Sequence, residues 1–407
     1  MSLLTCVFMV LMPFIMEISS RSSLLLVSLA AIGCLGTFLL SQLPSLQRYS
    51  YATMMSAISW RIYLIRYQVI CGLAITGYGM WRSDLIIFGE ALIAFFAGAC
   101  VIVLFRPRTS ETLVKLLWLS VVIACAFILI ELSTQMSARR ALGVRWNTFI
   151  FNRTLIVIVL LYWPLMYGLM RYLSGKKRFL AMSSLTFLVC FALFKAESGA
   201  AILAFCGGMF TWLVTWAISR FTPKIPIFIL VIGLLSAFVL APVIGEISAR
   251  LLSKNIHSTL KDGHSQDRVN IWTSFGAAVR DAPLLGQGFG SSATIAQRDV
   301  AKRVPPDERV MLGSGHPHQM FLQIWVELGI VGVVIAFLLI GWGVIKPLAK
   351  LSTHSCDYMY HATCYATLMS VILIALVGHG LWQGWWIAAI SASIAWLKAF
   401  KYERSET

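Results

Sequence analysis

The chain has 407 residues, of which 59% are hydrophobic and only 12% are charged, and its mean hydropathy is +0.81. Soluble domains carry about 25% charged residues, so this composition excludes an ordinary soluble enzyme and indicates a polytopic membrane protein. The 33 Lys and Arg residues against 17 Asp and Glu give a net charge of +16. Because most of the basic residues flank apolar runs, we expect them to set the orientation in the membrane and to meet anionic lipid substrates rather than nucleic acid.

Apolar runs long enough to span a bilayer recur along the chain, since a spanning helix needs about 20 residues. A β-barrel would instead show alternating segments of about ten residues, so we predict an all-α fold with about twelve transmembrane helices. The predicted spans are 3–18, 24–43, 62–80, 84–105, 112–132, 154–173, 178–194, 199–219, 225–245, 320–345, 358–378 and 382–399.

Lys and Arg are unevenly divided between the two sets of short connections, with sixteen in one set, termini included, and seven in the other. Because positively charged loops stay in the cytoplasm, both termini are predicted to be cytoplasmic. The chain then divides into a membrane bundle of nine helices over 1–245, a long periplasmic loop over 246–319, and three further helices with a cytoplasmic tail over 320–407.

The long loop is predicted to contain short helices. Val269, Trp272 and Phe275 recur at helical spacing within residues 267–279, and a helix lying on the membrane surface would present its aromatic side chains to the lipid headgroups. The glycine-rich stretch Gly286–Gly290 that follows is predicted to be a turn or loop.

A histidine pair stands where this loop meets the next predicted span. The sequence Gly315-His316-Pro317-His318-Gln319 cannot continue a helix, and Gln319, Gln323 and Glu327 then follow on one helical stripe. Polar groups are costly in a membrane, so the stripe is predicted to face the bundle interior, with His318 placed for general-base work. An interfacial histidine above a packing stripe is an equal alternative. Zinc is disfavoured, since no Cys, Asp or Glu stands at a useful spacing.

Basic residues also stand on the predicted outward side. The short loop with Arg139, Arg140, Arg145 and Arg153 breaks the positive-inside tendency, and arginine clusters bind phosphate or diphosphate well. The long loop adds further basic residues on this side, among them Arg268, Arg280 and Arg309. For most of these residues a solvated loop charge or a headgroup contact is the favoured interpretation. Arg268 is the exception, because the predicted helix around Trp272 would hold it in place.

The run His316–Gly332 (HPHQMFLQIWVELGIVG) resembles the signature of the O-antigen ligase and polymerase superfamily, a His-Asn pair followed by Leu-Gln and Glu-Leu-Gly. Two further segments resemble the same family in the same order. Arg268–Trp272 with Pro283–Gly288 is similar to its periplasmic Arg-x-x-x-Trp…Pro-Leu-x-Gly-x-Gly element, and Asn152-Arg153 before Trp163-Pro164 is similar to an earlier one.

The resemblance implies an O-antigen ligase of the bacterial inner membrane with a periplasmic active site. Such an enzyme is a metal-independent glycosyltransferase without a cofactor, and it moves a glycan from an undecaprenyl-diphosphate carrier to lipid A–core. Carried onto matching positions, His318 would be catalytic, supported by His316, Gln319, Gln323 and Glu327. Arg268 would bind the donor diphosphate.

This chain departs from the family pattern at two places. Gln319 replaces the usual Asn after the histidine, and the Arg of a Ser-Arg-Gly segment is missing near Ser198. Arg153 and Lys195 are then the candidates for the second diphosphate contact, although Lys cannot form a bidentate pair.

Two alternative functions remain open. A polymerase that extends the glycan on its lipid carrier belongs to the same superfamily. A transporter or flippase is suggested by the intramembrane charges Arg66, Glu90 and Glu131, but the sequence shows no internal repeat.

Overall fold

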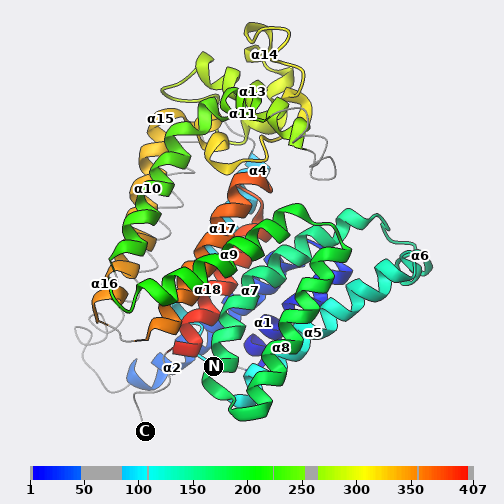
Figure 1. The fold of residues 1–407 in the computed structure, drawn as a ribbon, viewed down its shortest axis with the longest axis vertical. Coiled ribbons are helices and arrows are strands. Elements are labelled where there is room, and N and C mark those ends of the chain that lie inside the picture. The colour runs from blue at the N-terminus through cyan, green and yellow to red at the C-terminus, as the bar shows by residue number, and fades with distance from the viewer. Residues whose placement is uncertain are drawn as a thin grey trace.

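The structure is a computed structural model that describes residues 3–46, 85–107, 110–222, 224–252, 265–354 and 357–401, and these residues form helices and loops without a strand (Figure 1). The elements of the helical bundle, in chain order, are α1 (Leu3–Ile18), α2 (Ser22–Leu46), α4 (Leu85–Leu104), α5 (Glu111–Ser133), α6 (Ser137–Ala141), η1 (Thr148–Ile150), α7 (Phe151–Tyr172), α8 (Gly175–Lys195), α9 (Gly199–Ile218), α10 (Ile225–Leu240), α15 (Met320–Ile340), the π-helix η6 (Gly341–Ile345), α16 (Lys346–His354), α17 (Tyr358–Val377) and α18 (Gly384–Lys401).

The predicted all-α membrane fold is confirmed. The predicted span 62–80 lies outside the described residues, and each of the other eleven coincides with a helix. Among the described residues, eight helical segments are long and apolar enough to cross a membrane, and two apolar helical segments, Leu3–Ile18 and Gly89–Leu104, are shorter. The total of twelve spans stays a prediction.

Helix α7 forms the centre of the bundle. It packs against α1, α5, α8, α9, α17 and α18, and every side chain from Leu155 to Leu161 is fully buried. On one side Gly208 of α9 lets two helices approach, because a Cβ there would lie 2.4 Å from Trp163 and 2.6 Å from the Ser370 hydroxyl.

The long loop folds into short elements that gather at one end of the molecule (Figure 1). These are η2 (Ala241–Val243), α11 (Ile244–Leu251), α13 (Ser265–Asp281), η4 (Ser291–Gln297), α14 (Val300–Arg303) and η5 (Leu312–Ser314). The predicted helix over 267–279 is confirmed as α13, and Gly286–Gly290 lies in a loop as predicted.

The expectation that α13 presents its aromatic residues to lipid headgroups is wrong. Phe275 is 0% exposed and Trp272 is half-buried, because α11, η2 and α15 cover this side of α13. The contact with α11 is close. A Cβ on Gly245 would lie 2.3 Å from the backbone nitrogen of Thr273.

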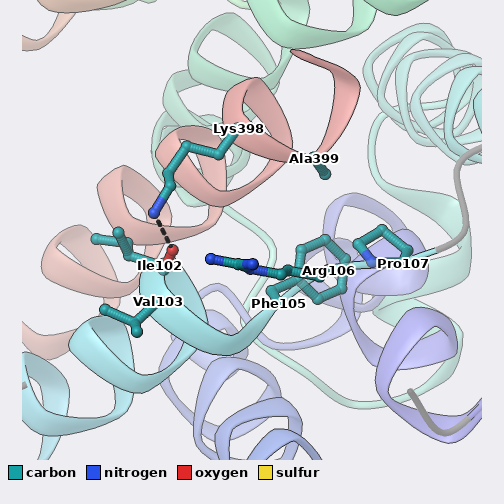
Figure 2. Close-up of a pocket in the computed structure, with 7 residues that line it drawn as sticks. All are labelled: Ile102, Val103, Phe105, Arg106, Pro107, Lys398 and Ala399. Atoms are coloured by element: carbon teal, nitrogen blue, oxygen red, sulfur yellow. Dashed lines mark hydrogen bonds between the residues drawn. The ribbon is translucent and has the colours of Figure 1, made fainter. Parts of the chain in front are cut away.

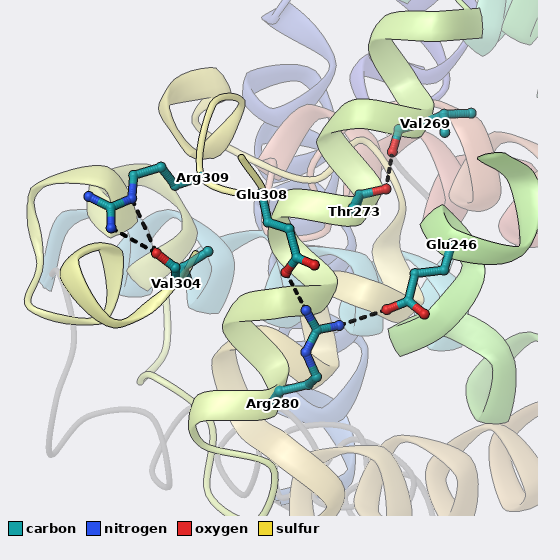
Figure 3. Close-up of polar contacts among 7 residues, drawn as sticks. All are labelled: Glu246, Val269, Thr273, Arg280, Val304, Glu308 and Arg309. Carbon is teal, nitrogen blue, oxygen red and sulfur yellow. Dashed lines mark hydrogen bonds and ion pairs between the residues drawn. The ribbon is translucent and has the colours of Figure 1, made fainter. Parts of the chain in front are cut away.

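Several of the outward arginines hold the loop together (Figure 3). The Arg280 guanidinium pairs with Glu246 at 2.7 Å and also with Glu308. Arg309 donates to the Val304 carbonyl at 2.8 Å. The contacts of Arg280 and Arg309 therefore support a structural role, which is to stabilise the folded loop.

Candidate active site

The candidate site rests on a break in α15. Gly329 has φ 61° and ψ −161°, which interrupts the helix. The loop that starts at Pro283 fills the gap: the Ile330 amide donates to the Pro283 carbonyl at 2.9 Å, and the Gln287 amide donates to the Val326 carbonyl at 2.7 Å. Backbone groups released by the break are therefore paired across the junction, as buried polar groups require.

Glycine is required on both sides of this junction. A Cβ on Gly329 would lie 2.4 Å from the Leu284 carbonyl oxygen, and a Cβ on Gly286 would lie 2.4 Å from the carbonyl carbon of Glu327. Both glycines also have positive φ, which side chains rarely adopt. The Pro-Leu-x-Gly-x-Gly and Glu-Leu-Gly segments, distant in sequence, thus form one backbone junction.

The polar stripe of α15 faces two loops. Glu327 is fully buried, and one of its oxygens accepts from the Gly290 amide and from the Trp382 indole, each at 2.6 Å. Its other oxygen accepts from the Gln323 amide group at 2.9 Å, and Gln323 in turn accepts from the Leu381 backbone at 2.8 Å.

Gln319 begins the same helix. Its side-chain oxygen accepts from the Leu322 amide and caps the N-terminus of α15. The side chains of the stripe therefore hold the loops 286–290 and 378–383 against α15. His318 directly precedes the capped start of this helix.

The hydrogen bonds of His318 determine which ring nitrogen carries its proton. Its Nδ1 lies 2.9 Å from the Gly378 carbonyl oxygen. Because a carbonyl oxygen only accepts, Nδ1 carries the hydrogen and Nε2 keeps a free lone pair. The backbone has φ 52° here, and positive φ at a non-glycine residue is uncommon and concentrates at functional sites.

His316 supports this arrangement. Its Nδ1 accepts from the His318 backbone amide at 3.2 Å, and the two imidazole centroids are 4.1 Å apart. Since Nδ1 of His316 is an acceptor, its own hydrogen must be on Nε2 when the ring is neutral.

Both histidines are held in the neutral state. Burial lowers the pKa of His316 to about 4, helped by the nearby charges of His318 and Arg153. Burial also lowers the pKa of His318 and outweighs the raising effect of the Gly378 hydrogen bond, while the positive charge of Arg268 adds a smaller lowering effect. A neutral imidazole with a free lone pair can accept a proton.

Two arginines on separate helices act electrostatically on the histidines, Arg153 on His316 and Arg268 on His318. Arg153 stands in the first turn of α7, with its guanidinium carbon 5.5 Å from the centre of the Trp385 ring. Arg268 stands in the first turn of α13, and burial lowers the pKa of its guanidinium. The structure therefore brings Arg153, Arg268, His316 and His318 together.

Lys195 does not join this group by any contact. It ends α8 with an exposed side chain and makes no hydrogen bond or ion pair with a described residue. Its proposed role as the second diphosphate contact has less structural support than that of Arg153.

Sequence reasoning missed the loop 378–383. Gly378 supplies the carbonyl that orients His318, and the charges of Arg153, His316 and His318 all act on the pKa of His379. A signal was present, because this short loop lies between the predicted spans 358–378 and 382–399, on the same predicted side as His318.

Glu90 and Glu131, the two described residues among the intramembrane charges named above, accept hydrogen bonds from backbone amides. Glu131 accepts from the Ala138 and Arg139 amides at 3.0 and 3.1 Å, and Glu90 accepts from the Gly384 amide at 3.1 Å. Arg66 lies outside the described residues. The partners of Glu90 and Glu131 are backbone groups at helix starts, as is common for a carboxylate.

A cavity of about 140 Å³ lies at the other end of α18 (Figure 2). Lys398, which donates to the Ile102 carbonyl at 2.7 Å, follows Gly384 by fourteen residues, or about 21 Å of helix. This cavity is therefore separate from the histidines. It is lined by Ile102, Val103, Phe105, Arg106, Pro107, Lys398 and Ala399.

Comparison with known proteins matches residues 184–337 to the family described as O-antigen ligase. Relatives named as candidate polysaccharide ligases include one from Rickettsia conorii, 26% identical over 309 residues, which are 75% of this chain and 71% of the relative. Another, from Rickettsia felis, is 25% identical over 322 residues, or 79% of this chain and 74% of the relative.

The matched region contains Arg268, the junction at Gly329 and both site histidines, whereas Arg153 and the loop 378–383 lie outside it. The fold, the site and the relatives agree with the motifs in the sequence. The resemblance to the O-antigen ligase superfamily is confirmed: this is a multi-pass membrane protein whose residues 184–337 match the O-antigen ligase family.

Proposed function

We propose that this protein is an O-antigen ligase that transfers a glycan from undecaprenyl diphosphate to lipid A–core at the periplasmic face of the bacterial inner membrane. One observation carries the proposal. His318 has Nδ1 committed to the Gly378 carbonyl and Nε2 left as a proton acceptor, within range of the Arg268 charge.

In the proposed reaction, the acceptor is a sugar hydroxyl of lipid A–core. His318 Nε2 takes the hydroxyl proton as the oxygen attacks the anomeric carbon of the glycan. The bond from that carbon to the diphosphate oxygen breaks, and undecaprenyl diphosphate leaves with the bonding electron pair. Arg268 and Arg153 offset the charge that develops on the leaving group, as fixed donors do at many active sites.

The donor already contains the activated bond, so the proposed reaction needs no nucleotide and no metal ion. The electrostatics fit an anionic donor. Arg21 and Arg145 act on Arg153 in addition to the nearby Glu90, which makes the surroundings of Arg153 predominantly positive. A site with several cations and neutral histidines attracts a diphosphate.

The test is a cell whose only copy of the protein carries His318→Ala. Surface glycan linked to lipid A–core should disappear while the amount of protein in the membrane stays unchanged. The matched control is His361→Gln, since His361 is also a buried histidine but stands in the first turn of α17, at the opposite end of that helix from Gly378. Normal surface glycan in the His318→Ala cell would overturn the catalytic assignment.

A further inference from the structure

We propose that His379 binds the diphosphate of the lipid-linked donor, as an N–H donor beside Arg153. This inference rests on the proposed function, because it concerns how the same site holds its donor. His379 belongs to neither the matched family region nor the motifs that carry the resemblance.

The two chain neighbours of His379 both contact the site histidines. The Gly378 carbonyl oxygen lies 2.9 Å from His318 Nδ1. On the other side, a Cβ on Gly380 would lie 3.5 Å from the His316 ring. His379 therefore lies at the site, because the residues on either side of it, Gly378 and Gly380, are placed against His318 and His316.

A single indole positions His379 and Arg153. The His379 ring meets the Trp385 ring nearly edge-on, with centroids 5.0 Å apart at 83°, and the Arg153 guanidinium carbon lies 5.5 Å from the centre of that ring. Trp385 is 2% exposed. Its indole donates to Gln383 at 2.6 Å, and its carbonyl accepts from the Ser23 hydroxyl at 3.0 Å.

The loop that carries His379 is also fixed before any ligand binds. Gln323 holds the Leu381 amide, Glu327 holds the Trp382 indole, and Glu90 holds the Gly384 amide. Three attachments within four residues give the preorganisation that a binding residue needs.

The charges around His379 select an anionic ligand. Burial lowers its pKa to about 3, and the charges of Arg153 and Arg268 and the neighbouring imidazoles of His316 and His318 act in the same direction. The ring is therefore neutral, with one N–H and one lone pair, and it makes no hydrogen bond to another described residue. A diphosphate oxygen would accept from the N–H and pair with Arg153 at the same time.

The experiment measures binding of undecaprenyl diphosphate to the purified full-length protein without an acceptor. His379→Ala should raise the Kd at least about tenfold, as expected for a lost hydrogen bond to a charged group. Binding of undecaprenol, which has no phosphate, should stay within twofold. Asn and Gln both carry an amide N–H donor. Whichever of His379→Asn and His379→Gln places this donor at the position of the ring N–H should recover most of the affinity.

Two controls separate the loss of this contact from general misfolding of the protein and from an effect on lipid A–core, the other phosphorylated substrate. His361→Gln should bind undecaprenyl diphosphate as the wild type does, and lipid A–core should bind His379→Ala with unchanged affinity. Unchanged diphosphate affinity in His379→Ala would overturn the proposal. So would an equal loss for undecaprenol, or a loss confined to lipid A–core.

The proposed function fails in a different way. If the wild-type protein transferred no glycan to any acceptor, the ligase assignment would be lost, while the binding measurement would still decide whether His379 holds a diphosphate.

Discussion

His318 combines two properties that an ordinary loop histidine lacks. Its tautomer is set by a carbonyl 2.9 Å from Nδ1, and its pKa is lowered by burial and by the charge of Arg268. The first property aims the lone pair of Nε2, and the second keeps that lone pair available in mildly acidic solution. General-base catalysis depends on both.

This electrostatic arrangement predicts a pH profile. Because the His318 pKa is below its ordinary value of about 6.5, the transfer rate should fall on acidification only below that pH. Arg268→Gln removes a charge that lowers this pKa, so the pKa should rise and the fall should begin at higher pH. Arg268→Lys keeps the charge and should leave its position nearly unchanged.

The measurement is kcat against pH at saturating donor for the wild type and both variants. An acid limb at the same pH in Arg268→Gln and the wild type would show that Arg268 does not act on the base.

At the residue scale, the sequence allowed part of the site to be predicted. Arg153, Arg268, His316 and His318 were identified from residue type and family motif, and the structure brings them together. Gly378 and His379 were missed because they act through a backbone carbonyl and a short loop, neither of which has a distinctive residue pattern. Whether these residues act catalytically stays a prediction.

At the scale of elements, the junction between α15 and the loop at Pro283 explains why two distant glycine motifs occur together. Each would be an ordinary loop or helix glycine if considered alone. The contact between the two motifs depends on which distant segments the tertiary fold brings together, and hydrophobic periodicity does not reveal this. The helices themselves were predictable, because long apolar runs in a membrane have few alternatives to helix.

The junction predicts a specific loss of stability. Gly329→Ala places a Cβ 2.4 Å from the Leu284 carbonyl oxygen at φ 61°, and unfavourable backbone alone costs about 1–3 kcal/mol. The Tm in detergent should fall by several degrees or more. Gly341→Ala is the matched control, since Gly341 follows the same helix with φ −54° and no atom within 4 Å of its Cβ position.

Thermal unfolding monitored by circular dichroism compares the two variants. Equal Tm values for Gly329→Ala and Gly341→Ala would contradict the requirement for glycine at the junction.

At the scale of the whole molecule, the basic residues that follow α7 and the candidate active site lie at opposite ends of the same two helices. Helices α7 and α18 both begin near the histidines and end together, where the Arg171 guanidinium donates to the Lys401 carbonyl at 2.9 Å. Lys176, Lys177 and Arg178 stand in the first turn of α8, the helix that follows α7. The count of sixteen against seven basic residues predicts that this basic end is cytoplasmic.

The polarity predicts which cysteines a membrane-impermeant maleimide can reach. In a variant without the native cysteines, Val310→Cys, at a loop position that is 74% exposed, should be labelled in spheroplasts. Lys177→Cys should be labelled only after the membrane is permeabilised. The reverse pattern would invert the topology and place the histidines on the cytoplasmic side.

Reconstitution of the purified protein with undecaprenyl-diphosphate-linked glycan, lipid A–core and excess chelator, in the absence of nucleotide, tests the proposed ligase activity most directly. Glycan should appear on lipid A–core with the wild type and not with His318→Ala. Longer glycans on the lipid carrier would instead indicate a polymerase. The absence of any product would contradict the glycosyltransferase assignment and favour transport.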